Sequence, residues 1–86
     1  MASMAYAERA LKKAGMEPRW GDGNSQEKNL LWARYRNMIV EVYGSNGRIV
    51  AINVRRDGDV DDPAADYFAG SYADNMAQAI RWAKEW

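Results

Sequence analysis

The chain has 86 residues, of which 48% are hydrophobic and 12% aromatic, so one domain can bury its own core without disulfides or a metal. It contains no Cys and no His, which removes thiol nucleophiles, Cys-based zinc sites and the commonest general base. Twelve basic and twelve acidic residues cancel, yet residues 1 to 56 hold ten Lys or Arg against five Asp or Glu, and residues 57 to 86 hold two against seven. We therefore expect a single domain, residues 1 to 86, that is not an enzyme and uses no cofactor or metal.

The first predicted element is an amphipathic helix that begins after Ser3 and ends at Gly15. Ser is a favoured N-cap residue, and Gly15 and Pro18 are typical of a helix end. Its apolar residues recur at helical spacing and are Met4, Ala7, Ala10, Leu11 and Ala14. Residues 20 to 28 lack periodicity and contain several turn formers, so a loop is expected there. No window approaches the roughly 18 apolar residues of a membrane span, and no secretion signal is visible, which predicts a soluble cytoplasmic protein.

Three strands are predicted between residues 30 and 56. Leu30 to Tyr35 forms the first strand, and a tight turn is expected at Arg36-Asn37 because Asn tolerates positive φ. A three-residue loop at residues 45 to 47, with Gly47 in the left-handed region, joins the second strand to the third. This loop predicts that Val42 faces Val50 and Val40 faces Ile52 on one side of the sheet, and that Glu41 faces Ala51 on the other. In this register one face of the sheet, which we call the inner face, is apolar and carries Leu31, Ala33, Tyr35, Met38, Val40, Val42, Val50, Ile52 and Val54.

The last part of the chain holds an acidic segment followed by a helix. Residues 57 to 66 are expected to be an acidic loop, and residues 66 to 72 either form a short fourth strand or are irregular. Ser71 with Asp74 resembles a capping box, and the apolar stripe of the helix that follows consists of Met76, Ala79, Ile80 and Ala83. Trp82 and Trp86 lie on one flank of that stripe, where core or rim packing is the default and a helix-in-groove contact the alternative.

The predicted fold is α+β. It consists of a helix, an antiparallel three-stranded meander sheet, an optional short fourth strand and a C-terminal helix, with both helices on one sheet face.

The opposite face of the sheet, which we call the outer face, is the first candidate site. Its predicted partner-binding residues are Leu30, Trp32, Arg34, Ile39, Tyr43, Ile49, Asn53 and Arg55. Aromatic residues and Arg are enriched where protein interfaces concentrate their binding energy, and a large exposed apolar patch is unusual on a monomer. Three interpretations remain open. They are a surface that binds a partner, a second small core covered by residues 15 to 28 or by a helix, and a strand register that differs from the predicted one.

The acidic residues Asp57, Asp59, Asp61 and Asp62 form the second candidate site. The first three match the 1, 3, 5 spacing of a calcium loop, but Asp62 occupies the required Gly position and Phe68 replaces the final Glu. The segment is therefore not an EF-hand. A solvated acidic turn, docking on a basic surface and weak divalent-cation binding remain as interpretations, and no metal ligand is assigned.

Nucleic-acid binding is a weaker interpretation of the same outer face, since sheet aromatics can stack on bases. The order αβββα resembles the double-stranded RNA-binding domain, and Gly70-Ser71 stands where that family has its Gly and Ser. That family then grips phosphates with a Lys cluster, whereas residues 72 to 75 here are Tyr, Ala, Asp and Asn. The neutral net charge also removes the term that dominates nucleic-acid affinity. A homodimer that pairs its outer faces is a further alternative.

In its short length, lack of Cys, richness in Trp and Tyr and αβ order, the chain resembles the small accessory proteins of phages and plasmids, a group that includes the anti-CRISPR proteins. The segment Tyr67-Phe-Ala-Gly-Ser-Tyr-Ala-Asp-Asn-Met-Ala-Gln-Ala-Ile-Arg-Trp-Ala resembles the strand-then-helix ending of small domains carried on mobile elements. The resemblance implies a stoichiometric inhibitor, monomeric or homodimeric, that binds a host protein or ribonucleoprotein complex and not a membrane. It assigns no site residue.

Overall fold

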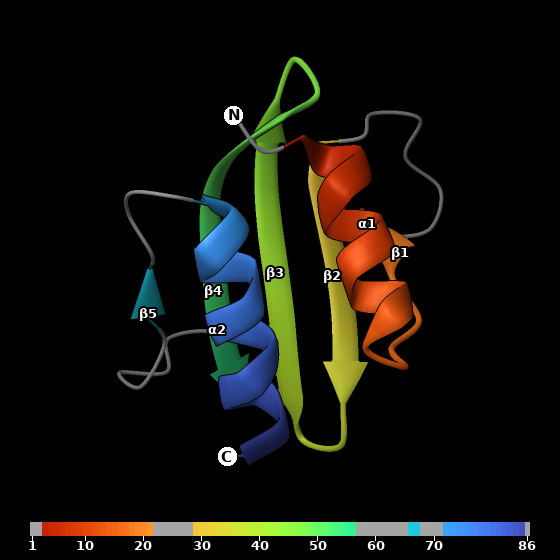
Figure 1. The fold of residues 1–86 in the computed structure, drawn as a ribbon, viewed down its shortest axis with the longest axis vertical. Coiled ribbons are helices and arrows are strands. Elements are labelled where there is room, and N and C mark those ends of the chain that lie inside the picture. The colour runs from red at the N-terminus through yellow and green to blue at the C-terminus, as the bar shows by residue number, and fades with distance from the viewer. Residues whose placement is uncertain (1–2, 22–28, 57–65, 68–71, 86) are drawn as a thin grey trace.

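Two helices pack on one face of a five-stranded antiparallel sheet (Figure 1). The computed structural model describes residues 3–21, 29–56, 66–67 and 72–85. The elements in chain order are α1 (Met4–Lys13), β1 (Arg19–Trp20), β2 (Leu30–Tyr35), β3 (Met38–Ser45), β4 (Arg48–Arg56), β5 (Asp66–Tyr67) and α2 (Tyr72–Glu85). The strands lie side by side in the same order as in the chain. The predicted α+β class is therefore confirmed, with β5 as the short strand after the acidic segment.

Strand β1 is an addition, because the sequence predicts a loop from Trp20 onward. Arg19 pairs with Trp32 and Trp20 pairs with Leu31, so β1 extends the sheet beyond β2. The indole Nε1 of Trp20 donates a hydrogen bond of 2.7 Å to Glu8 Oε2 on α1. This contact ties the edge of the sheet to the helix above it.

The ends of α1 are set by Ser3 and Gly15, as predicted. Ser3 Oγ accepts a hydrogen bond of 3.1 Å from the backbone N–H of Tyr6, which satisfies one of the donors left open by the first turn. Gly15 has φ +85°, its N–H donates to Lys12 O, and the N–H of Met16 donates to Leu11 O. These two bonds form a Schellman motif, which needs a left-handed residue at the position of Gly15.

The register between β2 and β3 is the predicted one. Leu31 pairs with Val42, Ala33 with Val40 and Tyr35 with Met38, which places all six on the inner face. The turn between the strands is tight, but the positive φ of 56° belongs to Arg36 and not to Asn37. The prediction of the turn was therefore correct in position and wrong in the residue that adopts the unusual backbone conformation.

The predicted register between β3 and β4 is wrong. Ser45 pairs with Arg48, so the turn has two residues, Asn46 with φ 52° and Gly47 with φ 78°. Two positive φ angles are typical of a type I′ turn, for which Asn-Gly is the preferred sequence. Beyond the turn a β-bulge shifts the pairing, because Gly44 pairs with Ile49 whereas Tyr43 pairs with Ala51.

The bulge exchanges the expected places of Ile49 and Val50. Ile49 is 4% exposed and belongs to the core, whereas Val50, the extra residue of the bulge, is 51% exposed. Further along, Val42 pairs with Ile52 and Val40 with Val54, two residues away from the prediction. An even shift keeps every side chain on its own face, and so the rest of the inner set is correct.

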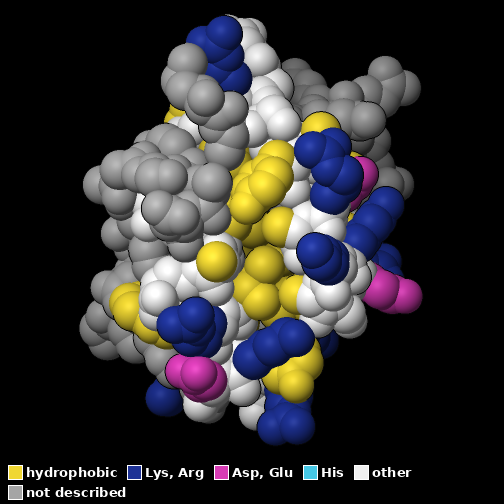
Figure 2. All heavy atoms as spheres, in the orientation of Figure 1, with side chains coloured by type: hydrophobic (Ala, Val, Ile, Leu, Met, Phe, Trp, Pro, Cys, Tyr) yellow, Lys and Arg dark blue, Asp and Glu magenta, His cyan; other side chains and the backbone are white. Residues whose placement is uncertain are grey.

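The core lies between the inner face and the two helices. Its largest fully buried side chains are Leu11, Leu31, Val40, Val42, Ile52, Val54 and Met76. On α2 the predicted residues Met76, Ala79 and Ala83 are buried, and Ile80 packs against the core while remaining partly exposed. Figure 2 shows hydrophobic side chains between the helices, with Lys and Arg around them. Neither described helix is both long enough and apolar enough to span a membrane.

Two predictions made for the C-terminal region depend on side chains that the structure does not describe. They are the Ser71 and Asp74 cap, of which Asp74 is placed only as backbone within α2, and the packing of Trp86. Trp82 is described and is partly buried, as expected for a side chain on the flank of the helix.

Candidate functional site

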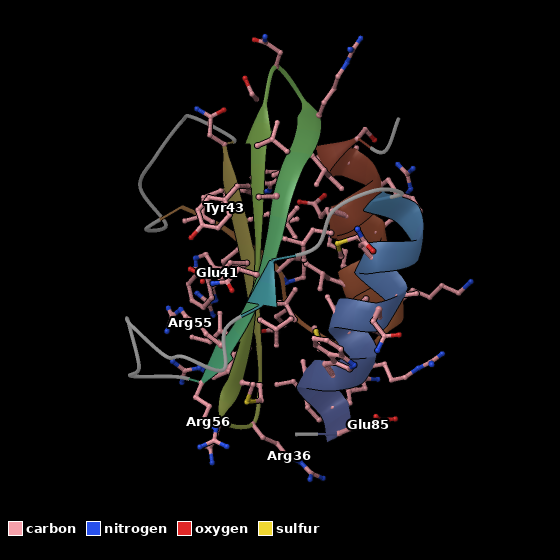
Figure 3. The ribbon with its side chains drawn as sticks, turned by 90° about the vertical axis from the view of Figure 1, so that its left-hand side faces the viewer. Arg36, Glu41, Tyr43, Arg55, Arg56 and Glu85 are labelled. Carbon is pink, nitrogen blue, oxygen red and sulfur yellow. The ribbon has the colours of Figure 1, made fainter. Side chains whose placement is uncertain are left out.

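The outer face of the sheet is turned away from both helices (Figure 3). Pairing across β2, β3 and β4 arranges its residues in three rows, which are Leu30–Tyr43–Ala51, Trp32–Glu41–Asn53 and Arg34–Ile39–Arg55. The sheet continues beyond these rows in β1, where Arg19 pairs with Trp32, and in β5, where the backbone of Tyr67 pairs with that of Asn53. Seven of the eight predicted partner-binding residues therefore share this face.

Ile49 is the exception and is a correction to the predicted site. The β-bulge at Tyr43 and Gly44 turns Ile49 inward, where it belongs to the core. Ala51 takes its place beside Tyr43 on the outer face. A smaller side chain therefore stands where a large apolar one was expected.

Burial on the outer face is uneven. Ile39 is 4% exposed and Asn53 is 5% exposed, whereas Arg34 is exposed. Leu30, Trp32, Tyr43 and Arg55 are half-buried. The open apolar patch predicted from the sequence is thus replaced by a buried centre with aromatic and basic side chains around it.

Glu41 is at the middle of this buried centre. Its Oε1 accepts a hydrogen bond of 3.0 Å from Asn53 Nδ2 and one of 2.9 Å from Arg55 Nε. The hydroxyl of Tyr43 is a weaker donor to Oε2, at 3.4 Å. A buried carboxylate is costly unless it is paired and hydrogen-bonded, and these three donors meet that requirement. Figure 3 shows Glu41, Tyr43 and Arg55 on the same side of the sheet.

Sequence reasoning missed Glu41 as a site residue. The predicted register placed it beside Ala51, which offers no hydrogen bond, whereas the structure pairs it with Asn53. The available signal was the residue itself, since a carboxylate between Val40 and Val42 in a central strand needs a partner. Asn53 and Arg55, two positions apart on β4, are the polar residues that supply it.

Asn53 adds a second unusual feature to the network. Among the described residues, its Oδ1 is a buried side-chain oxygen without a hydrogen-bond donor. An unsatisfied buried acceptor costs about 1 to 3 kcal/mol, and such groups are rare in native proteins.

Trp32 forms one wall of a hollow beside this network. The hollow has a volume of about 380 Å³ and is lined by Glu17, Arg19, Trp32 and Arg34. The indole N–H of Trp32 donates to the carbonyl oxygen of Gly21, which fixes the orientation of the ring. Glu17 and Arg19 are 3.9 Å apart and mostly exposed, so this ion pair holds the guanidinium only weakly. The hollow thus offers a fixed aromatic surface between two Arg side chains.

The predicted acidic site, Asp57, Asp59, Asp61 and Asp62, lies outside the described residues. Within residues 3–21, 29–56 and 72–85, no group of three or more carboxylates is arranged to hold a metal ion.

Comparison with known proteins gives no match. No family model, curated protein or solved structure is significantly similar to this chain.

Proposed function

We propose that this protein is a non-enzymatic binding module that docks on another protein through its outer sheet face. The observation that carries the proposal is the hollow in which Trp32 is fixed between Arg19 and Arg34, on the face opposite both helices. Trp and Arg are the side chains most often found at the energetic centre of an interface. A ring held in place before binding loses little conformational entropy when a partner arrives.

The Glu41 network supports this use of the face. It holds Arg55 and Tyr43 on the same sheet face as Trp32 by hydrogen bonds to the carboxylate of Glu41. Polar groups that are locked by their own hydrogen bonds form a rigid surface, which favours specific docking over loose adhesion. The partner then meets a preformed arrangement of aromatic and basic groups.

Charge favours a protein partner over nucleic acid. Glu41 neutralises Arg55, Glu17 lies 3.9 Å from Arg19, and the whole chain has no net charge. The electrostatic attraction that dominates binding to phosphate backbones is weak on such a face. A partner with its own acidic and apolar side chains fits the hollow better than a strand of phosphates.

The resemblance to phage and plasmid accessory proteins supports a finer proposal. The protein would act in the cytoplasm as a stoichiometric inhibitor of a host defence complex of the CRISPR type. The acidic residues 57 to 62 would meet basic groups of that complex, since a dense row of carboxylates can imitate a phosphate backbone.

The test is a nuclease-treated pull-down from host lysate with the tagged protein, followed by mass spectrometry. We expect a stoichiometric host protein that is lost with Trp32→Ala and with Arg34→Glu, and is kept with Arg48→Glu, an exposed cation at the far hairpin turn. Circular dichroism shows whether each variant is folded. Arg34→Glu is needed because Trp32→Ala also removes the hydrogen bond to Gly21.

Other results would contradict the proposal. If only species that vanish with nuclease are captured, the face binds nucleic acid, and binding should then weaken steeply with salt. If nothing except the bait is captured and the mass in solution is doubled, the outer faces pair in a homodimer.

A further inference from the structure

A second hollow lies at the end of the molecule where the β2–β3 turn meets the C-terminus of α2. It has a volume of about 460 Å³ and is lined by turn residues 36 and 37, by Met38 at the start of β3, by Arg56 at the end of β4, and by residues 83 to 85 of α2. Figure 3 shows Arg36, Arg56 and Glu85 together at this end of the molecule. None of these residues belongs to the Trp32 hollow, so this site is separate from the proposed docking face.

Two of the cations in this hollow, Arg36 and Lys84, lie against an aromatic ring. Arg36 Cζ and Lys84 Nζ each lie 5.5 Å from the centroid of the Tyr35 ring. In the part of the chain that the structure describes, neither side chain forms an ion pair with a carboxylate. The electron-rich face of an aromatic ring attracts a cation but does not neutralise it. Among the described residues, no carboxylate therefore competes with an anion for these two charges.

We propose that this hollow binds the phosphate group of a nucleotide. Arg36 and Arg56 present planar guanidinium groups, which match two oxygens of a phosphate at once, and Lys84 adds a compact positive charge. Among the described lining residues there are three cations and one carboxylate, that of Glu85. The volume falls within the range of small-ligand sites. The phosphate belongs either to a free nucleotide or to a nucleic-acid strand.

Two features of the hollow weaken the binding of an anion. Glu85 contributes a negative charge, and the C-terminal carbonyl groups of α2 carry the negative end of the helix dipole. Removal of the Glu85 charge should therefore strengthen phosphate binding. If Glu85 only maintained the fold, its replacement would not tighten binding.

The probe for the test is inorganic pyrophosphate, titrated into the isotope-labelled full chain and followed by amide chemical shifts. We expect the shifts to concentrate at residues 36 to 38, 56 and 83 to 85. Arg36→Asn, which tolerates the positive φ, and Lys84→Gln should each weaken binding by about ten-fold. Glu85→Gln should tighten it by about two-fold. Arg48→Gln, at the opposite end of the sheet, should leave it unchanged.

A mononucleotide diphosphate and a short single-stranded oligonucleotide then distinguish the source of the phosphate. Tighter binding of the oligonucleotide at the same residues assigns the site to a strand, and tighter binding of the mononucleotide assigns it to a free nucleotide. The proposal is overturned if pyrophosphate causes no shifts, if shifts spread evenly to Arg9 and Arg48, or if both nucleotides fail to bind. This experiment does not test docking at the Trp32 hollow, which is tested separately with Trp32→Ala and Arg34→Glu.

Discussion

Arg55 Nε lies 2.9 Å from Glu41 Oε1, and the two residues are diagonal neighbours across β3 and β4. Side chains in this diagonal position are far enough apart that only long ones meet. Both are largely withdrawn from water, with side-chain exposures of 21% for Arg55 and 12% for Glu41. The pair is therefore a fixed part of the outer face and not a solvated surface ion pair.

Arg55→Met should destabilise the protein by about 2 to 4 kcal/mol, because it leaves the buried Glu41 carboxylate without its charged partner. Urea denaturation measures the change in the free energy of unfolding. The matched control is Arg48→Met at an exposed position, for which about 0.5 kcal/mol or less is expected. Equal costs for the two variants would show that the pair adds nothing to stability.

Ile49→Ala and Val50→Ala should differ strongly in their cost to the free energy of unfolding, although the residues are adjacent. Ile49 is 4% exposed, so its truncation leaves a cavity and should cost about 2 to 4 kcal/mol. Val50 is 51% exposed, so its truncation to Ala should cost about 0.5 kcal/mol or less. Thermal and urea unfolding of the two variants check the β-bulge directly. If Val50→Ala cost more than Ile49→Ala, Val50 would be the buried residue, as the three-residue loop predicted from the sequence requires.

Gly44→Ala should destabilise the fold by about 1 to 3 kcal/mol through overpacking. A Cβ at this position would lie 2.5 Å from Met4 Sδ and 3.0 Å from the carbonyl oxygen of Arg48. In a Met4→Ala background the first clash disappears, so the added cost of Gly44→Ala should fall. A double-mutant cycle measures this coupling, and strict additivity of the two substitutions would sink the explanation.

Ser3→Ala should cost about 1 kcal/mol, because the hydrogen bond from the Tyr6 N–H to Ser3 Oγ is lost at the start of α1. Ser3→Asp should restore most of that stability, since Asp is also a good N-cap and its charge favours a helix N-terminus. Ser45→Ala, an exposed position at the end of β3, serves as the control. The midpoint of urea denaturation decides between these outcomes.

The fold could be predicted from the sequence wherever a local rule, such as a helix cap or a short turn, agreed with the hydrophobic pattern. Ser3 and Gly15 mark the ends of α1 through backbone chemistry that depends on few neighbours. Both faces of the β2–β3 hairpin follow from alternation of apolar residues together with a short turn. The assignment of both helices to the inner face then follows from the need to bury their apolar stripes.

The fold could not be predicted from the sequence where two or more local backbone conformations have similar energies. The segment Ser45-Asn46-Gly47 is compatible with a two-residue and a three-residue turn, and the alternation of residues 49 to 54 suits both. Close packing of Met4 against Gly44 is a tertiary contact that the pattern of β3 and β4 does not contain. The Glu41 network depends on the final register, and so it was not visible before the register was known.

Strand β1 was missed for a related reason. Two residues are too few to show alternation, and Arg19 and Trp20 lie between Pro18 and a run of turn formers. Its formation depends on the exposed edge of β2 and on the hydrogen bond between Trp20 and Glu8. The Trp32 hollow uses Arg19 from this strand, which is why the sequence did not reveal it.

The order of the strands in the sheet is the order of the strands in the chain. Each strand pairs with its neighbours in sequence, so the two long hairpins close short loops and lose little chain entropy before their contacts form. Proteins dominated by such local contacts fold faster than those that must join distant segments. We therefore expect the central meander to assemble quickly after synthesis and to present a nearly complete sheet on which α2, the last element, can dock.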